Sequence, residues 1–168
     1  MGLKYKWHDE TTELEVYGDC SFSPTGRYSQ EGNVAFAGSS LVDWRSKRQT
    51  LMATSSCEGE LIAASSSLVM GRKMRLLLTE LTGREKLQFR IHCDNTAAIA
   101  QIRQGDDAGW RNRHVSIRAF AIVVAVRHGE TTIEFCETAL MAADGLTKGV
   151  GPQILSRMME LWNMVSVV

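Results

Sequence analysis

The sequence lacks a net charge, because 19 Lys and Arg residues balance 19 Asp and Glu residues among its 168 residues. A protein that binds nucleic acid by itself is often strongly basic, and this chain has no basic excess. Net charge sums over all surfaces, however, so a cluster of acidic residues could balance a basic face elsewhere. Neutrality therefore excludes a uniformly basic binding protein and leaves open a protein with separate acidic and basic regions.

Paired cysteines and long apolar runs are also missing. The four cysteines stand singly at positions 20, 57, 93 and 136 without C-x-x-C spacing, which favours free thiols in a reducing compartment. No stretch resembles a signal peptide, and none is long enough to span a bilayer. We therefore expect a cytoplasmic protein that has no membrane partner.

The composition is that of an ordinary globular protein, with 44% hydrophobic and 23% charged residues. Residues 1–12 are polar and mixed, as in a lead-in or linker. We expect residues 13–168 to form a single domain that is long enough to bury a core.

Strand and helix patterns follow one another in an order typical of an α/β protein. Short runs with β character predict strands at 14–22, 33–38, 40–44, 87–93 and 131–136. Helical spacing and end signals predict a long helix between Ser55 or Ser56 and Gly83, and further helices at 96–104, 112–126, 139–146 and from Pro152. Three antiparallel strands followed by a right-handed crossover to two parallel strands give a mixed five-stranded sheet flanked by helices.

Apolar residues at helical spacing indicate which side chains enter the core. The predicted core residues of the two amphipathic helices are Leu61, Ala64, Leu68, Met74, Leu78, Leu81, Ile154, Leu155, Met158, Leu161 and Trp162. We also expect Trp44 in the core.

Four carboxylates lie within or beside these elements. Asp19 is inside the first strand, where a buried acid is costly unless a cation or a hydrogen-bonded partner compensates it. Asp94 ends the fourth strand, and parallel neighbours would bring these two acids to the crevice where α/β sheets bind ligands. Glu60 projects from the start of the long helix, and Asp144 follows the last strand. Taken singly, Asp94 could be a helix cap and Asp144 a turn residue.

Carboxylates that are brought together repel one another, so at neutral pH some are protonated or the group holds cations. Oxygen ligands without His or Cys suit magnesium or manganese better than zinc. Two such ions about 3.5–4 Å apart are a known arrangement for in-line displacement at phosphorus. The pattern therefore predicts phosphoryl-transfer chemistry at this crevice.

The order of four motifs resembles the ribonuclease H domain at the C-terminal end of copia-type LTR retrotransposon polyproteins: YGDCSF, CEGELIAAS, HCDNTAAIAQI and AADGLTKG. The segments VDWRSKRQT and RNRHVSIRAF resemble further parts of that family. The resemblance implies a ribonuclease H-like fold and hydrolysis of the RNA strand of RNA/DNA hybrids, leaving 3′-hydroxyl and 5′-phosphate ends. It implies a reverse transcriptase domain in the same polyprotein as a partner, and a location within cytoplasmic virus-like particles.

The resemblance also assigns the metal ligands. The family's four positions carry over to Asp19, Glu60, Asp94 and Asp144, which would hold two magnesium ions with manganese as a substitute. Glu58 is the alternative to Glu60, but Glu60 directly precedes LIAA, which matches the family's glutamate. We expect Glu58 to face solvent.

The chain departs from its relatives at two places. Cellular ribonucleases H carry a histidine shortly before the last aspartate, whereas ETALMAA has none here. Ser116 and Ala119 replace an acidic residue and a second histidine of the family. We expect His114 to be a packed or capping residue.

Polar and basic residues near the acids are candidates for contacts with nucleic acid. They are Arg45, Lys47, Arg48, Ser56, Asn95 and Arg113. The basic residues could equally be a solvated loop. Two other functions remain open: a different nuclease of the same fold, such as a junction resolvase or deoxyribonuclease, and an inactive module that binds hybrids or proteins.

Overall fold

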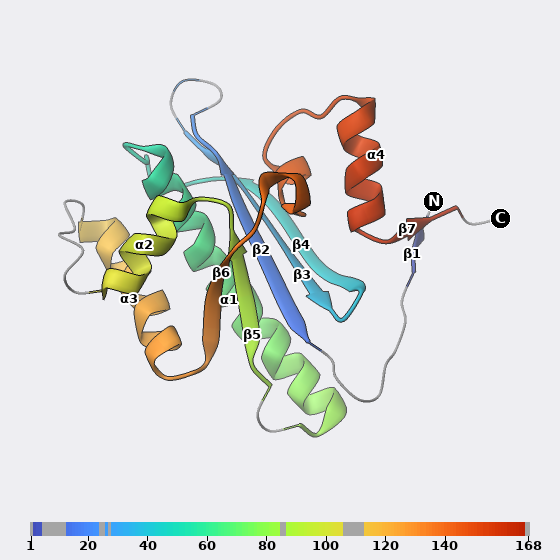
Figure 1. Ribbon diagram of the computed structural model, residues 1–168, viewed down its shortest axis with the longest axis horizontal. Helices are drawn as coiled ribbons and strands as arrows, with labels where there is room; N and C mark the ends of the chain where they lie inside the picture. Colours follow the sequence, from blue (N-terminus) through green and yellow to red (C-terminus); the bar gives the residue numbers. More distant parts are fainter. Residues whose placement is uncertain are drawn as a thin grey trace.

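The computed structural model describes residues 2–4, 13–23, 26, 28–84, 87–105 and 113–166. The sheet consists of five strands: β2 (Leu14–Ser21), β3 (Gln30–Ala37), β4 (Ser40–Arg48), β5 (Phe89–Cys93) and β6 (Thr131–Phe135). Their order is β4-β3-β2-β5-β6, antiparallel from β4 to β2 and parallel from β2 to β6. The predicted mixed sheet is therefore confirmed, with β2 at its centre (Figure 1).

Helices lie on both sides of this sheet. The helical elements are α1 (Ser56–Thr82), α2 (Thr96–Gln104), α3 (Arg113–Arg127), the 3₁₀ turns η2 (Thr138–Leu140) and η3 (Asp144–Leu146), and α4 (Pro152–Leu161). The long α1 covers one face, while η3 and α4 lie on the other (Figure 1). The predicted 139–146 helix is thus two separate 3₁₀ turns.

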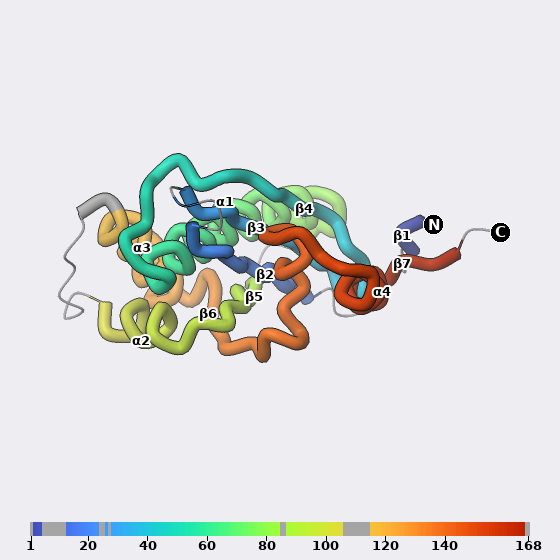
Figure 2. The backbone as a smooth tube through the Cα atoms, turned by 90° about the horizontal axis from the view of Figure 1, so that it is seen from above, coloured from blue at the N-terminus to red at the C-terminus, as the bar shows by residue number. Residues whose placement is uncertain are grey.

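A small two-stranded sheet pairs a segment near the start of the chain with one near its end. The strands β1 (Gly2–Leu3) and β7 (Met164–Val165) pair antiparallel, and Figure 2 shows them beyond α4, away from α2 and α3. Residues 5–12 lie outside the described residues, so the division of the chain at residue 13 stays a prediction. The loop at 106–109 and the start of the predicted 112–126 helix also lie outside them.

The ends of α1 follow the signals in the sequence. Ser55 is the N-cap, and its side chain accepts a hydrogen bond from the Glu58 amide at 3.2 Å. The Glu58 carboxylate accepts in turn from the amide of Thr54 at 2.7 Å. At the other end Gly83 adopts φ 70°, and its amide donates to the Thr79 carbonyl, as expected for a left-handed glycine cap.

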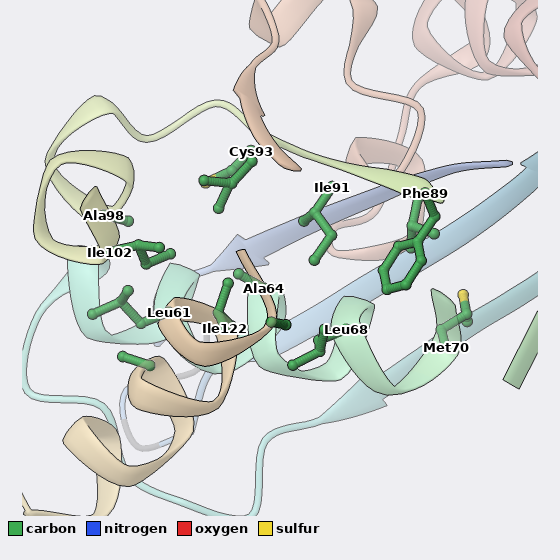
Figure 3. Close-up of a cluster of buried hydrophobic side chains, with 14 of the residues drawn as sticks. Leu61, Ala64, Leu68, Met70, Phe89, Ile91, Cys93, Ala98, Ile102 and Ile122 are labelled. Carbon is green, nitrogen blue, oxygen red and sulfur yellow. The ribbon is translucent and has the colours of Figure 1, made fainter. Parts of the chain in front are cut away.

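The main core lies between α1 and the sheet. Figure 3 shows Leu61 and Leu68 of α1 together with Phe89 and Ile91 of β5 and Ile122 of α3, all nearly inaccessible to solvent. A second, smaller cluster covers the opposite face and consists of Val34, Phe36, Leu41, Cys136, Met141, Ala142 and Ala143. This second cluster fixes the segment between β6 and η3 against the sheet.

Replacing Gly71 by alanine tests the closeness of α1 to the sheet. A Cβ atom at Gly71 would lie 2.3 Å from a ring carbon of the buried Phe89. Overpacking of this kind costs about 1–3 kcal/mol, and the better helix propensity of alanine returns less than about 1 kcal/mol. We expect Gly71→Ala to lower the free energy of unfolding in urea, whereas Val69→Ala at an exposed position of α1 changes it little. Unchanged stability of Gly71→Ala would show that the Phe89 ring has room to move.

Several predicted core residues are exposed. Trp44 is 55% exposed because β4 is an edge strand with a neighbour on one side only. Ile154 and Leu155 are 40% and 42% exposed, since α4 contacts the body of the protein through the fully buried Met158 instead. Leu81 is 66% exposed in the last turn of α1. These four predictions were wrong, because burial depends on which neighbours lie opposite each face.

The expectation for Trp162 holds in part, and that for the cysteines holds. Trp162 is half-buried, packs against the second cluster, and donates its indole N–H to the Ala142 carbonyl at 2.9 Å. The cysteines are free, two of them buried and two partly buried. Within the described part of the chain, none of the helices has the length and apolar character needed to cross a bilayer.

Candidate active site

Asp19 lies on the central strand and is 5% exposed. The Thr147 hydroxyl donates a hydrogen bond of 2.6 Å to Asp19 Oδ2. On the neighbouring strand, a Cβ atom at Gly32 would lie 2.7 Å from the Ala143 carbonyl oxygen. Glycine at this position therefore lets the η3 segment approach the strand and reach Asp19.

Glu60 enters the same region from the first turns of α1. Its Oε1 accepts a hydrogen bond from the Cys20 amide at 3.3 Å. Its Oε2 is buried and has no hydrogen-bond partner among the described residues. Glu58, by contrast, turns back to Thr54 at the start of the helix. Of the two glutamates, Glu60 is the one that lies with the other acids.

Asp94 follows β5 directly. The parallel register pairs Tyr17 with His92, so Asp19 and Asp94 are each two residues farther along neighbouring strands. Asp94 Oδ2 accepts a hydrogen bond from the Thr138 hydroxyl at 3.1 Å. The capping alternative for Asp94 was wrong: Asn95 is the N-cap of α2, and its Oδ1 accepts from the Ala98 amide at 3.0 Å. The carboxylate of Asp94 is thus not used in capping.

Asp144 completes the group from η3 and is 4% exposed. Its Oδ1 pairs with Lys148 Nζ at 2.5 Å, and its Oδ2 lies 3.7 Å from Arg157 Nη2. The sequence motif contains the lysine, but nothing in the sequence pointed to an arginine from the next helix. Neither Lys148 nor Arg157 was predicted as a partner of Asp144.

The acids influence one another electrostatically. Burial raises the pKa of the Asp19 carboxyl, the Thr147 hydrogen bond opposes this rise, and the charges of Asp94 and Asp144 add to it. Burial also raises the pKa of Glu60 to about 9, with further contributions from the charges of Asp19 and Asp94. The structure therefore brings the four predicted acids into one mutually repelling cluster.

The donor atoms fit a divalent cation. Glu60, Cys93 and Asp94 each offer an atom such that all three atoms lie within 4.8 Å of one another. Burial raises the pKa of the Cys93 thiol, so it stays protonated and the useful donors are carboxylate oxygens. A cation at this place would satisfy the unpaired Glu60 Oε2 and offset the repulsion among the carboxylates. Hard oxygen donors of this kind are typical of magnesium or manganese sites.

Three of the basic candidates for nucleic-acid contacts, Arg45, Lys47 and Arg48, lie on the edge strand β4, which is longer than expected and takes the place of the solvated loop. Lys47 Nζ is paired at 2.9 Å with Glu31 Oε1, a fully buried carboxylate that sequence reasoning missed. The Arg48 guanidinium lies over the Tyr28 ring, 4.9 Å from its centroid. Arg45 is exposed.

The remaining candidates differ in position. Ser56 is exposed at the first residue of α1, and Asn95 is partly exposed next to Asp94. Arg113 begins α3, but its side chain and that of His114 lie outside the described residues. Ser56 and Asn95 thus lie near Glu60 and Asp94 in the sequence, and their contacts with a substrate remain predictions.

Comparison with known proteins supports the resemblance seen in the motifs. No family model matches the sequence. The Ty1-JR2 Gag-Pol polyprotein of Saccharomyces cerevisiae is 24% identical over 162 residues, which cover 93% of this chain. The chain spans only 9% of the length of that polyprotein.

Two solved structures show the same architecture. LC11-RNase H1, isolated from compost and solved with an RNA/DNA hybrid, has a TM-score of 0.54 at 12% identity, covering 85% of this chain and 99% of that one. The prototype foamy virus protease-reverse transcriptase has a TM-score of 0.51 at 12% identity, covering 97% of this chain and 22% of that one. The chain therefore has the ribonuclease H-like fold that its motifs implied, and its sequence is similar to that of copia-type retrotransposon Gag-Pol polyproteins.

Proposed function

We propose that this protein is a ribonuclease H: a metal-dependent endonuclease that hydrolyses the RNA strand of RNA/DNA hybrids and leaves 3′-hydroxyl and 5′-phosphate ends. One observation carries the proposal. Four carboxylates from four separate segments lie together, and one buried oxygen of Glu60 among them has no hydrogen-bond partner in the part of the chain that the structure describes. Such a cluster is costly in a folded protein unless it holds cations.

In this proposal Asp19, Glu60, Asp94 and Asp144 hold two magnesium ions, for which manganese can substitute. Bound there, such a pair supplies an activated water and stabilises the leaving oxygen at phosphorus. The protein's own part is to keep the ligands in place. The hydroxyls of Thr147 and Thr138 each donate to one carboxylate, at Asp19 and Asp94, and restrict its orientation.

The proposed substrate is an RNA/DNA hybrid, which is the ligand in the structure of LC11-RNase H1, a protein of similar fold. Arg45, Arg48, Ser56 and Asn95 would contact its sugar-phosphate backbone, with Lys47 and Arg113 as further candidates. Phosphate contacts position a duplex without reading its sequence.

The neutral chain gives little general attraction to nucleic acid. We therefore propose a reverse transcriptase domain in the same polyprotein as the partner that adds affinity. The foamy virus relative, which joins a protease and a reverse transcriptase in one chain, supports this arrangement. Reverse transcription within cytoplasmic virus-like particles is the setting that such a partner implies.

Substrate choice and metal dependence test the proposal together. The protein is incubated with labelled RNA/DNA hybrid, double-stranded RNA, duplex DNA and a four-way junction, each with magnesium, manganese or a chelator. We expect cleavage of the RNA strand of the hybrid only, and its loss with chelator. Asp94→Asn, purified in parallel, controls for contaminating nuclease and is expected to be inactive.

Other outcomes identify the rival functions. Cleavage of the junction or of duplex DNA alone would replace ribonuclease H by another nuclease of this fold. Binding of the hybrid without cleavage at any metal concentration would identify a module that binds but does not cut.

A further inference from the structure

Lys148 is the side chain that most directly opposes the acidic cluster. Its ammonium lies 2.5 Å from Asp144 Oδ1, and it follows Thr147, whose hydroxyl is fixed to Asp19. Thr147 is therefore hydrogen-bonded to Asp19, and the next residue, Lys148, forms an ion pair with Asp144. This arrangement places a positive charge inside the region where the proposed cations would lie.

The two cations near Asp144 come from different elements and lie at different distances from it, Lys148 at 2.5 Å and Arg157 at 3.7 Å. Arg157 belongs to α4, and the adjacent Met158 is fully buried, with its Cγ 2.6 Å from where a Cβ of Gly145 would be. Lys148 lies beyond η3, and its side chain is 49% exposed. Both side chains reach solvent, with Lys148 49% and Arg157 40% exposed, but only the arginine is carried by a helix that is fixed next to the site through Met158.

An ammonium and a divalent cation compete for the same oxygen. A magnesium ion binds a carboxylate oxygen at about 2.0–2.1 Å. Asp144 Oδ1 already faces Lys148 Nζ at 2.5 Å, so a metal ion bound to this oxygen would lie close to the ammonium and be repelled by it. Lys148 must move for the metal to bind there.

We propose that Lys148 is a built-in counter-cation of the site: its ammonium holds Asp144 when no divalent cation is bound and competes with that cation for the Asp144 carboxylate. This inference rests on the proposed function, because it takes Asp144 as a metal ligand. It adds that one residue of the chain sets the concentration of magnesium at which the site fills. Removing the ammonium then makes the metal-free protein less stable and the metal-bound protein easier to form.

The test compares Lys148→Met and Lys148→Gln with the unmodified protein. Thermal unfolding is measured in chelator, and binding of magnesium and of manganese is measured by titration calorimetry. We expect the melting temperature in chelator to fall by about 2–4 °C and the metal dissociation constant to fall by about 5–20-fold. Using two variants keeps the test decisive if one does not fold.

Lys73→Met is the matched control, because Lys73 forms an exposed ion pair with Asp43 at 3.1 Å outside the site. It should leave metal affinity unchanged. Unchanged or weaker metal affinity in the Lys148 variants overturns the inference while the proposed function stands. If the unmodified protein binds neither magnesium nor manganese, the proposed metal-dependent function fails, and this inference fails with it.

Discussion

Asp19→Asn is expected to lower hydrolysis of the hybrid by more than about a hundredfold while making the metal-free protein more stable. Loss of an outer partner of a metal ligand already costs about 10–100-fold, so loss of a central ligand costs more. The stability of the metal-free protein should increase, because burial and the neighbouring charges of Asp94 and Asp144 raise the pKa of Asp19 and penalise its ionised form. Removing the charge should add about 0.5–2 kcal/mol to the free energy of unfolding.

Cleavage of labelled hybrid and urea denaturation in chelator measure the two effects. Asp43→Asn is the control, because this carboxylate lies on β4 and pairs with Lys73 outside the site. It should change neither activity nor stability by much. Retained cleavage in Asp19→Asn would remove Asp19 from the metal site, and a large loss of stability would show that Thr147 requires a charged partner.

The stability of the metal-free protein should fall as the pH rises from about 4.5 to about 9, with Glu60 as the main cause beside the raised pKa of Asp19. Burial, with the charges of Asp19 and Asp94, raises the pKa of this carboxyl from 4.5 to about 9. The folded state therefore keeps a proton that the unfolded chain releases above its own pKa. The stability is complete below the unfolded pKa and is lost progressively up to the folded one. Each pKa unit corresponds to about 1.4 kcal/mol, so the loss amounts to several kcal/mol.

Urea denaturation in chelator at a series of pH values measures this slope. Glu60→Gln should reduce this slope to the part due to Asp19, whereas Glu58→Gln, two residues away and bonded to Thr54, should follow the unmodified protein. Magnesium should restore stability above neutral pH, because it replaces the proton on Glu60. An equal slope in Glu60→Gln would assign the pH dependence to other groups.

The amino-acid sequence determined much of this protein. Strand and helix patterns predicted the mixed five-stranded sheet, since short links favour antiparallel neighbours and the crossover to the fourth strand is right-handed. The Ser55 cap and the Gly83 stop could be predicted because they depend on local backbone chemistry. Four motifs in the right order also identified the acids that the structure brings together.

The tertiary structure decided which side chains meet. The bond from Thr147 to Asp19 joins residues 128 positions apart, and the pairing of Arg157 with Asp144 depends on the docking of α4. Lys47 likewise pairs with the buried Glu31 across neighbouring strands, although the sequence suggested either a contact for nucleic acid or a solvated loop for it. Trp44 is exposed because its strand is at the sheet edge.

The range of each interaction explains which features could be predicted from the sequence and which required the tertiary structure. Caps, turns and hydrophobic periodicity act over a few residues and can be read along the chain. Burial, ion pairing and the shifted pKa values of Asp19 and Glu60 arise from neighbours that only folding supplies. The sequence therefore determined which four acids to consider. The tertiary structure decided the raised pKa values of Asp19 and Glu60, the hydroxyl partners of Asp19 and Asp94, and the lysine that pairs with Asp144.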